Sequence, residues 1–195
     1  LHHILMKMIK TRALALLFLV SVLLPSCQGG PPLSHLVPES VNLPGHRTKG
    51  AESVYESKAL VASARQVKKD EVSNAFLSSL LEKDFVVISM TLENRSASKA
   101  IYKPNYTALM NSVDYLKPLD YPDLYELGGE SVDELKGRFY DLDTVMHPGG
   151  KSTALLIFAP LSKDARKALL EVREYYVGTE TITFSLPFQL KATPY

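Results

Sequence analysis

The chain has no tryptophan and a single cysteine, Cys27, among its 195 residues. One thiol excludes a disulfide within the chain, so a folded core has to be held by packing. Neither sign of charge is in clear excess, because the chain has 22 Lys and Arg and 21 Asp and Glu. No run of basic residues alternates with aromatic ones. A field strong enough to hold nucleic acid is therefore not expected.

Motifs for covalent catalysis are missing as well. There is no Gly-x-Ser-x-Gly elbow in the sequence. Gly150-Lys151-Ser152 is similar to the end of a phosphate-binding loop, but Val145 stands where that loop needs its first glycine, and a strand is expected to follow instead of a helix. The sequence predicts a non-catalytic protein without a cofactor, and it indicates no small-molecule substrate.

Long hydrophobic runs are absent, but a short one lies near the N-terminus. Three basic residues between positions 7 and 12 precede an apolar run at 13–24, which is shorter than the about 20 residues that a membrane-spanning helix needs. This order is typical of an export signal. Residues 1–26 are therefore predicted to be a signal peptide, with residues 1–5 upstream of the true start.

The residues Leu24-Pro25-Ser26-Cys27 resemble the lipobox of bacterial lipoproteins. The resemblance implies cleavage between Ser26 and Cys27 and diacylation of the Cys27 thiol, which anchors the protein to a membrane because each buried methylene contributes about 0.8 kcal/mol. Gln28 stands where an Asp would resemble an inner-membrane retention signal, so we expect the cell envelope, at the outer membrane and facing the periplasm. The alternative is an ordinary cleaved signal peptide with an incidental cysteine.

Glycine and proline are frequent in the segment that follows Cys27. They disfavour both helix and sheet. Residues 27–52 are therefore predicted to be a lipid-modified N-terminus and a flexible tether, in which His35 and His46 are solvated spacers. The folded domain is predicted to occupy residues 53–195.

Alternation of apolar and polar residues is clearest near the C-terminus. The apolar positions there are Ile182, Phe184, Leu186, Phe188 and Leu190. They predict a strand with one buried face, paired in an antiparallel hairpin of strands 168–177 and 180–190. Because proline cannot donate to a ladder, Pro187 predicts a sheet edge or a bulge. Leu170, Val172 and Tyr176 share one parity in the first of these strands and are expected on one face.

The remaining elements indicate an all-β domain with one helical insert. Further strands are predicted at 58–67, 85–92, 106–115 and 153–159, a helix at 72–81, and a polar connection at 116–136 with one helical turn after Ser131. Several short strands without a βαβ rhythm predict a mainly β, antiparallel sandwich of about seven strands with one short helical insert.

Three features of this pattern resemble the immunoglobulin-like accessory domains of secreted bacterial lipoproteins. They are a strand that ends in Leu92-Glu93-Asn94-Arg95-Ser96, a turn Pro148-Gly149-Gly150-Lys151 that leads into Leu155-Leu156-Ile157-Phe158, and a terminal hairpin. The resemblance covers roughly residues 84–190. It implies an immunoglobulin-like sandwich without enzymatic activity.

Two groups of residues are candidate sites. Asp141 and Asp143 share one face of an extended segment and His147 follows, which is the best arrangement in the chain for a metal ion or for hydrolysis. The alternative, which the sequence favours, is a solvated strand edge, and no metal is predicted. The tyrosines in or near the acidic connection 116–136 are candidates for binding a partner protein, because tyrosine combines a large contact area with a polar tip. These are Tyr115, Tyr121, Tyr125 and Tyr140. The alternative for them is packing of the connection onto the sheet.

Three functions follow as hypotheses. The first is a lipid-anchored, non-catalytic envelope protein that binds a partner protein or assists an assembly. The second is a metal-dependent hydrolase, which requires Asp141, Asp143 and His147 to converge in a pocket. The third is a periplasmic carrier of a small ligand, which requires an apolar cavity of roughly 300 Å³ or more between the sheets.

Overall fold

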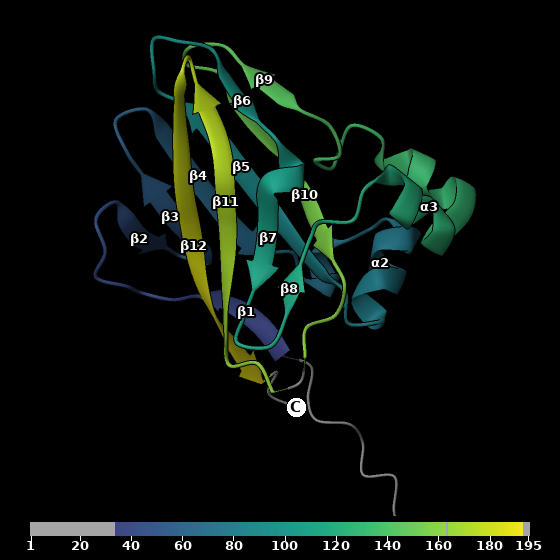
Figure 1. Ribbon diagram of the computed structural model, residues 1–195. Helices are drawn as coiled ribbons and strands as arrows, with labels where there is room; N and C mark the ends of the chain where they lie inside the picture. Colours follow the sequence, from purple (N-terminus) through teal and green to yellow (C-terminus); the bar gives the residue numbers. More distant parts are fainter. Residues whose placement is uncertain (1–33, 163, 193–195) are drawn as a thin grey trace, which may run out of the picture. The chain divides into compact units, whose positions relative to one another are not determined.

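The computed structural model describes residues 34–162 and 164–192. Within them the chain forms two antiparallel sheets packed face to face, which confirms the predicted mainly β sandwich (Figure 1). There are twelve strands in the described residues, against the about seven that the sequence predicts, because several of them are only two to five residues long. None of the helices among the described residues is long and apolar enough to cross a bilayer.

One sheet has five strands. In spatial order they are β10 (Lys151–Phe158), β5 (Val86–Asn94), β4 (Leu60–Gln66), β3 (Glu52–Glu56) and β2 (His46–Lys49). The predicted strands 58–67, 85–92 and 153–159 correspond to β4, β5 and β10, and are confirmed to within a few residues. β5 lies between β10 and β4 and alternates strictly from Ile88 onward, with Ile88, Met90 and Leu92 fully buried against the other sheet.

The other sheet has seven strands. Five of them pair in the order β1 (Ser34–Pro38), β12 (Glu180–Ala192), β11 (Lys167–Val177), β6 (Ala100–Tyr102) and β9 (Thr144–Met146). Two further strands extend the sheet: β7 (Thr107–Met110) pairs with β11, and β8 (Tyr115–Leu116) pairs with β7. The predicted terminal hairpin is confirmed as β11 and β12. The strand predicted at 106–115 is instead a hairpin of β7 and β8, because Asn111 and Asp114 form the turn between them.

A β-bulge in β11 changes which tyrosine is buried. Val172 pairs with Phe184 and Tyr175 pairs with Ile182, so two residues of β11 lie opposite one residue of β12. The parity of the strand reverses at this point. Tyr175 is fully buried and Tyr176 lies on the opposite face, contrary to the prediction that Tyr176 shares a face with Val172.

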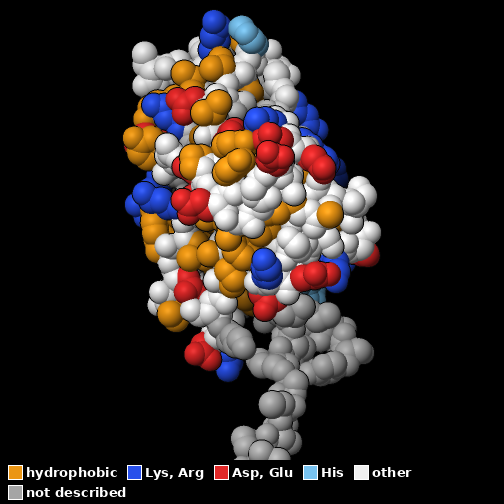
Figure 2. Space-filling view, turned by 90° about the vertical axis from the view of Figure 1, so that its right-hand side faces the viewer, with side chains coloured by type: hydrophobic (Ala, Val, Ile, Leu, Met, Phe, Trp, Pro, Cys, Tyr) orange, Lys and Arg blue, Asp and Glu red, His pale blue; other side chains and the backbone are white. Residues whose placement is uncertain are grey.

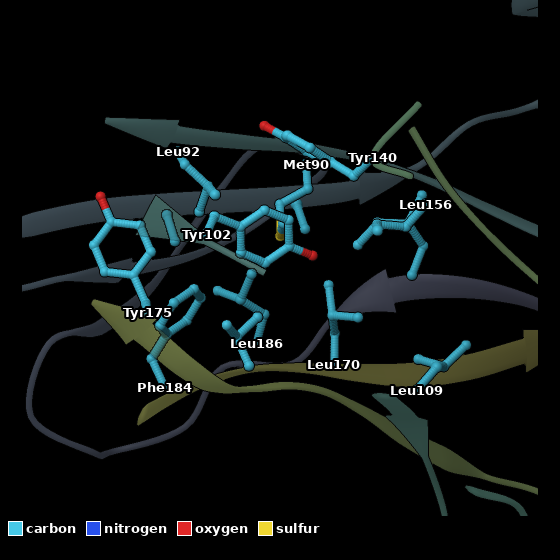
Figure 3. Close-up of a cluster of buried hydrophobic side chains, with 14 of the residues drawn as sticks. Met90, Leu92, Tyr102, Leu109, Tyr140, Leu156, Leu170, Tyr175, Phe184 and Leu186 are labelled. Carbon is cyan, nitrogen blue, oxygen red and sulfur yellow. The ribbon is translucent and has the colours of Figure 1, made fainter. Parts of the chain in front are cut away.

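Apolar side chains from the two sheets fill the space between them, as Figure 3 shows. Met90, Leu92 and Leu156 come from the five-stranded sheet and meet Leu170 and Leu186 of the other sheet. All five are at most 1 % exposed. The core is therefore continuous along the hairpin of β11 and β12, where the sequence alternates most clearly.

A third layer of short helices covers the outer face of the five-stranded sheet. It consists of α2 (Ala75–Glu82), α3 (Tyr121–Gly128) and the 3₁₀ helix η3 (Gly129–Leu135). The helix predicted at 72–81 is confirmed as α2, which begins after Asn74, whose side chain accepts a hydrogen bond from the Leu77 amide at 3.0 Å. The connection 116–136 holds α3 and η3 where only one helical turn was expected.

The predicted tether is wrong from Ser34 onward. β1 pairs with β12 over five residues, and β2 pairs with β3, so the folded unit begins at about residue 33 and not at 53. His46 is not a solvated spacer: its ring faces the carbonyl oxygen of Ser185 at 2.9 Å and contacts Tyr55 edge-on. Composition misled here because Pro38 is only the last residue of β1, and Pro44 and Gly45 lie between the two short strands.

Pro187 lies where β12 becomes an edge. Its carbonyl accepts from the Glu39 amide at 3.0 Å, just past the last residue of β1. In a strand the N–H and C=O of one residue point to the same side, so the missing donor of Pro187 falls where β1 has ended. The prediction of an edge at this residue is confirmed, because β1 pairs with β12 only from Phe188 to Ala192, and only Phe188 and Gln189 have strand partners on both sides.

Candidate functional site

The helix α3 begins with residues that cap its N-terminus. The Asp120 carboxylate accepts from the Asp123 amide at 3.0 Å, and the Asp123 carboxylate accepts from the Asp120 amide at 3.2 Å, which closes a capping box. Pro122 stands in the first turn, where its missing N–H costs nothing. The helix ends at Gly128, because Gly129 takes a positive φ of 55°.

The inner side of α3 and η3 packs against α2 and the five-stranded sheet. Leu124, Val132 and Leu135 are fully buried and pack with residues of α2 and with Val87 and Ile157 on the outer face of the five-stranded sheet. The ring of Phe76 from α2 lies against Gly128 of α3. This packing holds the outer side of α3 and η3 in a defined position.

The outer side combines aromatic, apolar and acidic side chains, and we call it the acidic tyrosine surface. Its members are Tyr121, Tyr125 and Leu127 together with Asp123, Glu126, Glu130 and Asp133. Tyr125 is 46 % exposed and Leu127 is 45 % exposed. Residues 120–136 contain six acidic residues and one basic residue, Lys136. Figure 2 views the molecule from this side, where hydrophobic and acidic side chains lie among one another.

Tyr121 is ordered by its neighbours on this surface. Its hydroxyl donates to the Asp133 carboxylate at 2.5 Å, and the Lys136 ammonium lies 5.1 Å from its ring centroid. The Tyr121 hydroxyl and then Lys136 lower the pKa of the Asp133 carboxyl, because both donate to its ionised form. The rings of Tyr121 and Tyr125 lie 6.0 Å apart at an angle of 34°, so two aromatic side chains present one contact area.

The four predicted tyrosines do not form one surface. Tyr115 is 53 % exposed but belongs to β8 of the seven-stranded sheet, where Arg173 lies over its ring. Tyr140 is 4 % exposed and packs edge-on against Tyr102 between the sheets, with its hydroxyl donating to Ser152 at 3.0 Å (Figure 3). Burial raises the pKa of Tyr140 to about 12. The prediction that Tyr140 binds a partner is therefore wrong.

The three candidate residues for a metal site are not brought together. Asp141 and Asp143 precede β9 and His147 follows it, and Asp143 and His147 are exposed. Among residues 34–162 and 164–192, no three His, Cys, Asp or Glu side chains are placed to hold a metal ion. The pocket that the metal-dependent hydrolase requires is therefore not formed by these three residues.

A depression of about 450 Å³ lies on the surface, at the end of the domain where β11 begins. Charged and polar residues contribute much of its lining, among them Glu39, Arg166 and Lys167. A carrier of the kind considered above needs an apolar cavity between the sheets. This depression is not that cavity.

Comparison with known proteins places the chain in no family. No family model matches the sequence, and no curated protein matches it. Among solved structures, the crystal structure of the yjhA protein from Bacillus subtilis is similar at 14 % identity over 74 % of this chain and 76 % of that chain, with a TM-score of 0.34. So low a score carries no argument about fold or function.

The sequence indicated the tyrosines and acids of this surface but not the helix that arranges them. Leu127 and Lys136 were not predicted as members. The signal was present in Asp120-Tyr121-Pro122-Asp123, a capping pattern with an early proline that marks a helix start. Ser26 and Cys27, the predicted cleavage and lipidation residues, lie outside the described residues.

Proposed function

We propose that this protein is a lipid-anchored, non-catalytic component of the bacterial cell envelope that binds a partner protein through the acidic tyrosine surface. The observation that carries the proposal is the arrangement of α3 and η3. Their inner side is buried against α2 and the sheet, whereas Tyr125 and Leu127 on their outer side are nearly half exposed. Apolar and aromatic side chains held outward on a fixed element support protein binding.

The chemistry of the surface favours a basic partner. Six acidic residues against one basic residue give residues 120–136 a strongly negative character. A lysine- or arginine-rich segment would be attracted to it, and its cations could also stack on the tyrosine rings. Tyr121 is already held by Asp133 and Lys136, so little side-chain freedom is lost on binding.

The proposed anchor rests on the sequence. Leu24-Pro25-Ser26-Cys27 supports acylation of Cys27, and Gln28 supports sorting to the outer membrane, with the domain in the periplasm. The domain itself is proposed to be of the immunoglobulin-like type, a refinement of the two-sheet sandwich. Cys27→Ser should move the protein from the membrane fraction to the soluble extract, and unchanged membrane partition would contradict acylation.

The binding surface is tested by cross-linking in intact cells followed by mass spectrometry. Wild type is compared with Tyr125→Ala, which removes an exposed aromatic side chain from α3. The matched control is Tyr115→Ala, because Tyr115 has a similar exposed fraction but lies on β8 of the seven-stranded sheet. We expect Tyr125→Ala to lower recovery of one enriched envelope protein by about tenfold, the loss of one moderate hot spot, and Tyr115→Ala to leave it unchanged. Equal recovery with all three proteins would overturn the proposal.

Charge is tested separately. Glu126→Lys reverses a charge on the outer side of α3 without touching its buried residues. We expect weaker capture of the same partner and a smaller loss of capture when salt is added, because fewer charge contacts remain to be screened. Stronger capture by this variant would exclude a basic partner.

A further inference from the structure

The structure shortens the link between the proposed anchor and the domain. Because β1 begins at Ser34, only the six residues from Gln28 to Leu33 separate it from Cys27. Seven steps of fully extended chain span at most roughly 25 Å. An acylated Cys27 therefore keeps Ser34 close to the lipid surface, whatever path the link takes.

The end of the domain that carries Ser34 is defined by the strand register. Ser34 lies opposite Ala192, the last residue of β12, whereas β12 begins beside Val177 at the other end. In Figure 1, β1 and the turn between β7 and β8 lie at the lower end, and β9 and the turn between β11 and β12 lie at the upper end. β12 has 13 residues, so at about 3.3 Å per residue the two ends are roughly 40 Å apart.

The Ser34 end exposes side chains that suit a phospholipid surface. Val113, on the turn between β7 and β8, is 66 % exposed, and Arg166 and Lys191 are exposed and have no ion pair among the described residues. Lys167 at the same end is paired with Glu39, and Asp164 is an exposed acid there. Asp114, a further acid at this end, is held by Ser162 and Asn111, so Arg166 and Lys191 are cations without an acidic partner among the described residues, whereas acids dominate the acidic tyrosine surface.

We propose that the Ser34 end rests on the phospholipid bilayer that holds the acyl chains of Cys27. Val113 is its apolar tip, and Arg166 and Lys191 face the phosphates of anionic headgroups. The inference rests on the proposed acylation and adds an orientation to it. The opposite end, with Val145 on β9, stands away from the bilayer by the length of the strands, and anionic lipid repels the acidic tyrosine surface and leaves it open to a partner.

The absence of tryptophan allows a direct test. Val113→Trp and Val145→Trp each introduce the chain's one tryptophan at an exposed valine, 66 % and 56 % exposed, at opposite ends of the domain. The acylated full-length proteins are reconstituted in vesicles of phosphatidylethanolamine and phosphatidylglycerol that contain lipid with a nitroxide on its headgroup. We expect quenching of Val113→Trp fluorescence to be several-fold stronger than that of Val145→Trp, and quenching by dissolved iodide to show the reverse order.

Co-sedimentation with the vesicles separates the two proposals. If the wild type sediments, Cys27→Ser does not, and both tryptophan variants are quenched equally, the orientation is wrong and the anchor stands. If the wild type fails to sediment, the anchor fails and the orientation fails with it. Circular dichroism of each variant excludes unfolding as the cause of any difference.

Charge reversal provides an independent readout. Arg166→Glu lies at the Ser34 end, and Lys99→Glu is the matched control at the other end, where the Lys99 carbonyl accepts from the Gly178 amide. Raising the share of phosphatidylglycerol should increase the quenching of Val113→Trp, and Arg166→Glu in that background should remove most of this increase. The same loss from Lys99→Glu would overturn the role of Arg166 at the Ser34 end.

Discussion

The ring of Phe76 occupies the space that a side chain at position 128 would need. A Cβ atom on Gly128 would lie 2.2 Å from Cε2 of Phe76. α2 and α3 are distant in sequence, and this contact sets how closely they approach (Figure 1). The acidic tyrosine surface therefore depends on a glycine that faces inward.

Gly128→Ala should destabilise the domain by about 1–3 kcal/mol, the usual cost of overpacking. The backbone at Gly128 has a negative φ of −130°, so the destabilisation comes from the contact with Phe76 and not from a left-handed backbone. Urea unfolding measures it. Phe76→Leu in the same chain should recover part of the loss, and strict additivity of the two changes would show that no clash exists.

Tyr175→Phe should raise the stability of the domain by about 1 kcal/mol, because it removes a buried hydroxyl that has no hydrogen-bond partner among the described residues. Tyr102→Phe is the matched comparison. The Tyr102 hydroxyl lies 2.8 Å from the buried Thr107 hydroxyl, so its removal should lower stability by a similar amount. Thermal unfolding should move the two midpoints in opposite directions; a shift of both the same way would contradict this assignment.

Asp114 should make the Ser34 end sensitive to acid. The Ser162 hydroxyl, then Asn111 and the Ser162 amide, donate to its carboxylate and lower its pKa. Since the pKa is lower in the folded state, the stabilisation is complete above the unfolded pKa of about 4 and is lost as pH falls through the lower folded value. Asp114→Asn should be less stable than wild type at neutral pH.

The measurement for Asp114 is the urea midpoint of both proteins from neutral to strongly acidic pH. The two curves should converge in acid. Ser162→Ala, which removes the donor with the largest effect on the Asp114 pKa, should show the same convergence. Parallel curves for wild type and Asp114→Asn across the whole range would refute the assignment.

Strands whose two faces differ were predictable from the sequence. β5 and β12 place apolar residues at every second position over long stretches, and the pairing of β12 with β11 follows from the two-residue turn at Gly178 and Thr179. Burial of one whole face leaves only one register possible, so local pattern and tertiary packing agree. The position and the buried face of a strand could be predicted where its own sequence alternates over many residues.

Short and polar elements were not predictable in the same way. β1 and β2 have five and four residues and carry too little pattern, and β1 acquires its strand structure from its partner β12. Tyr140 lies in a connection that looks polar, but its backbone pairs with Leu155 and turns the ring inward. Asp141 and His147 are separated because β9 lies between them, a strand of three residues that the sequence does not mark.

The β-bulge in β11 also bears on how relatives of this chain can differ. Deletion of one residue between Val172 and Tyr175 would remove the bulge and restore regular alternation, and Tyr175 would stay on the buried face of Val172, next to Phe184. The bulge therefore accommodates one extra residue without turning Tyr175 out of the core. Homologous chains should have either one or two residues between these positions, and the buried aromatic should follow in both cases.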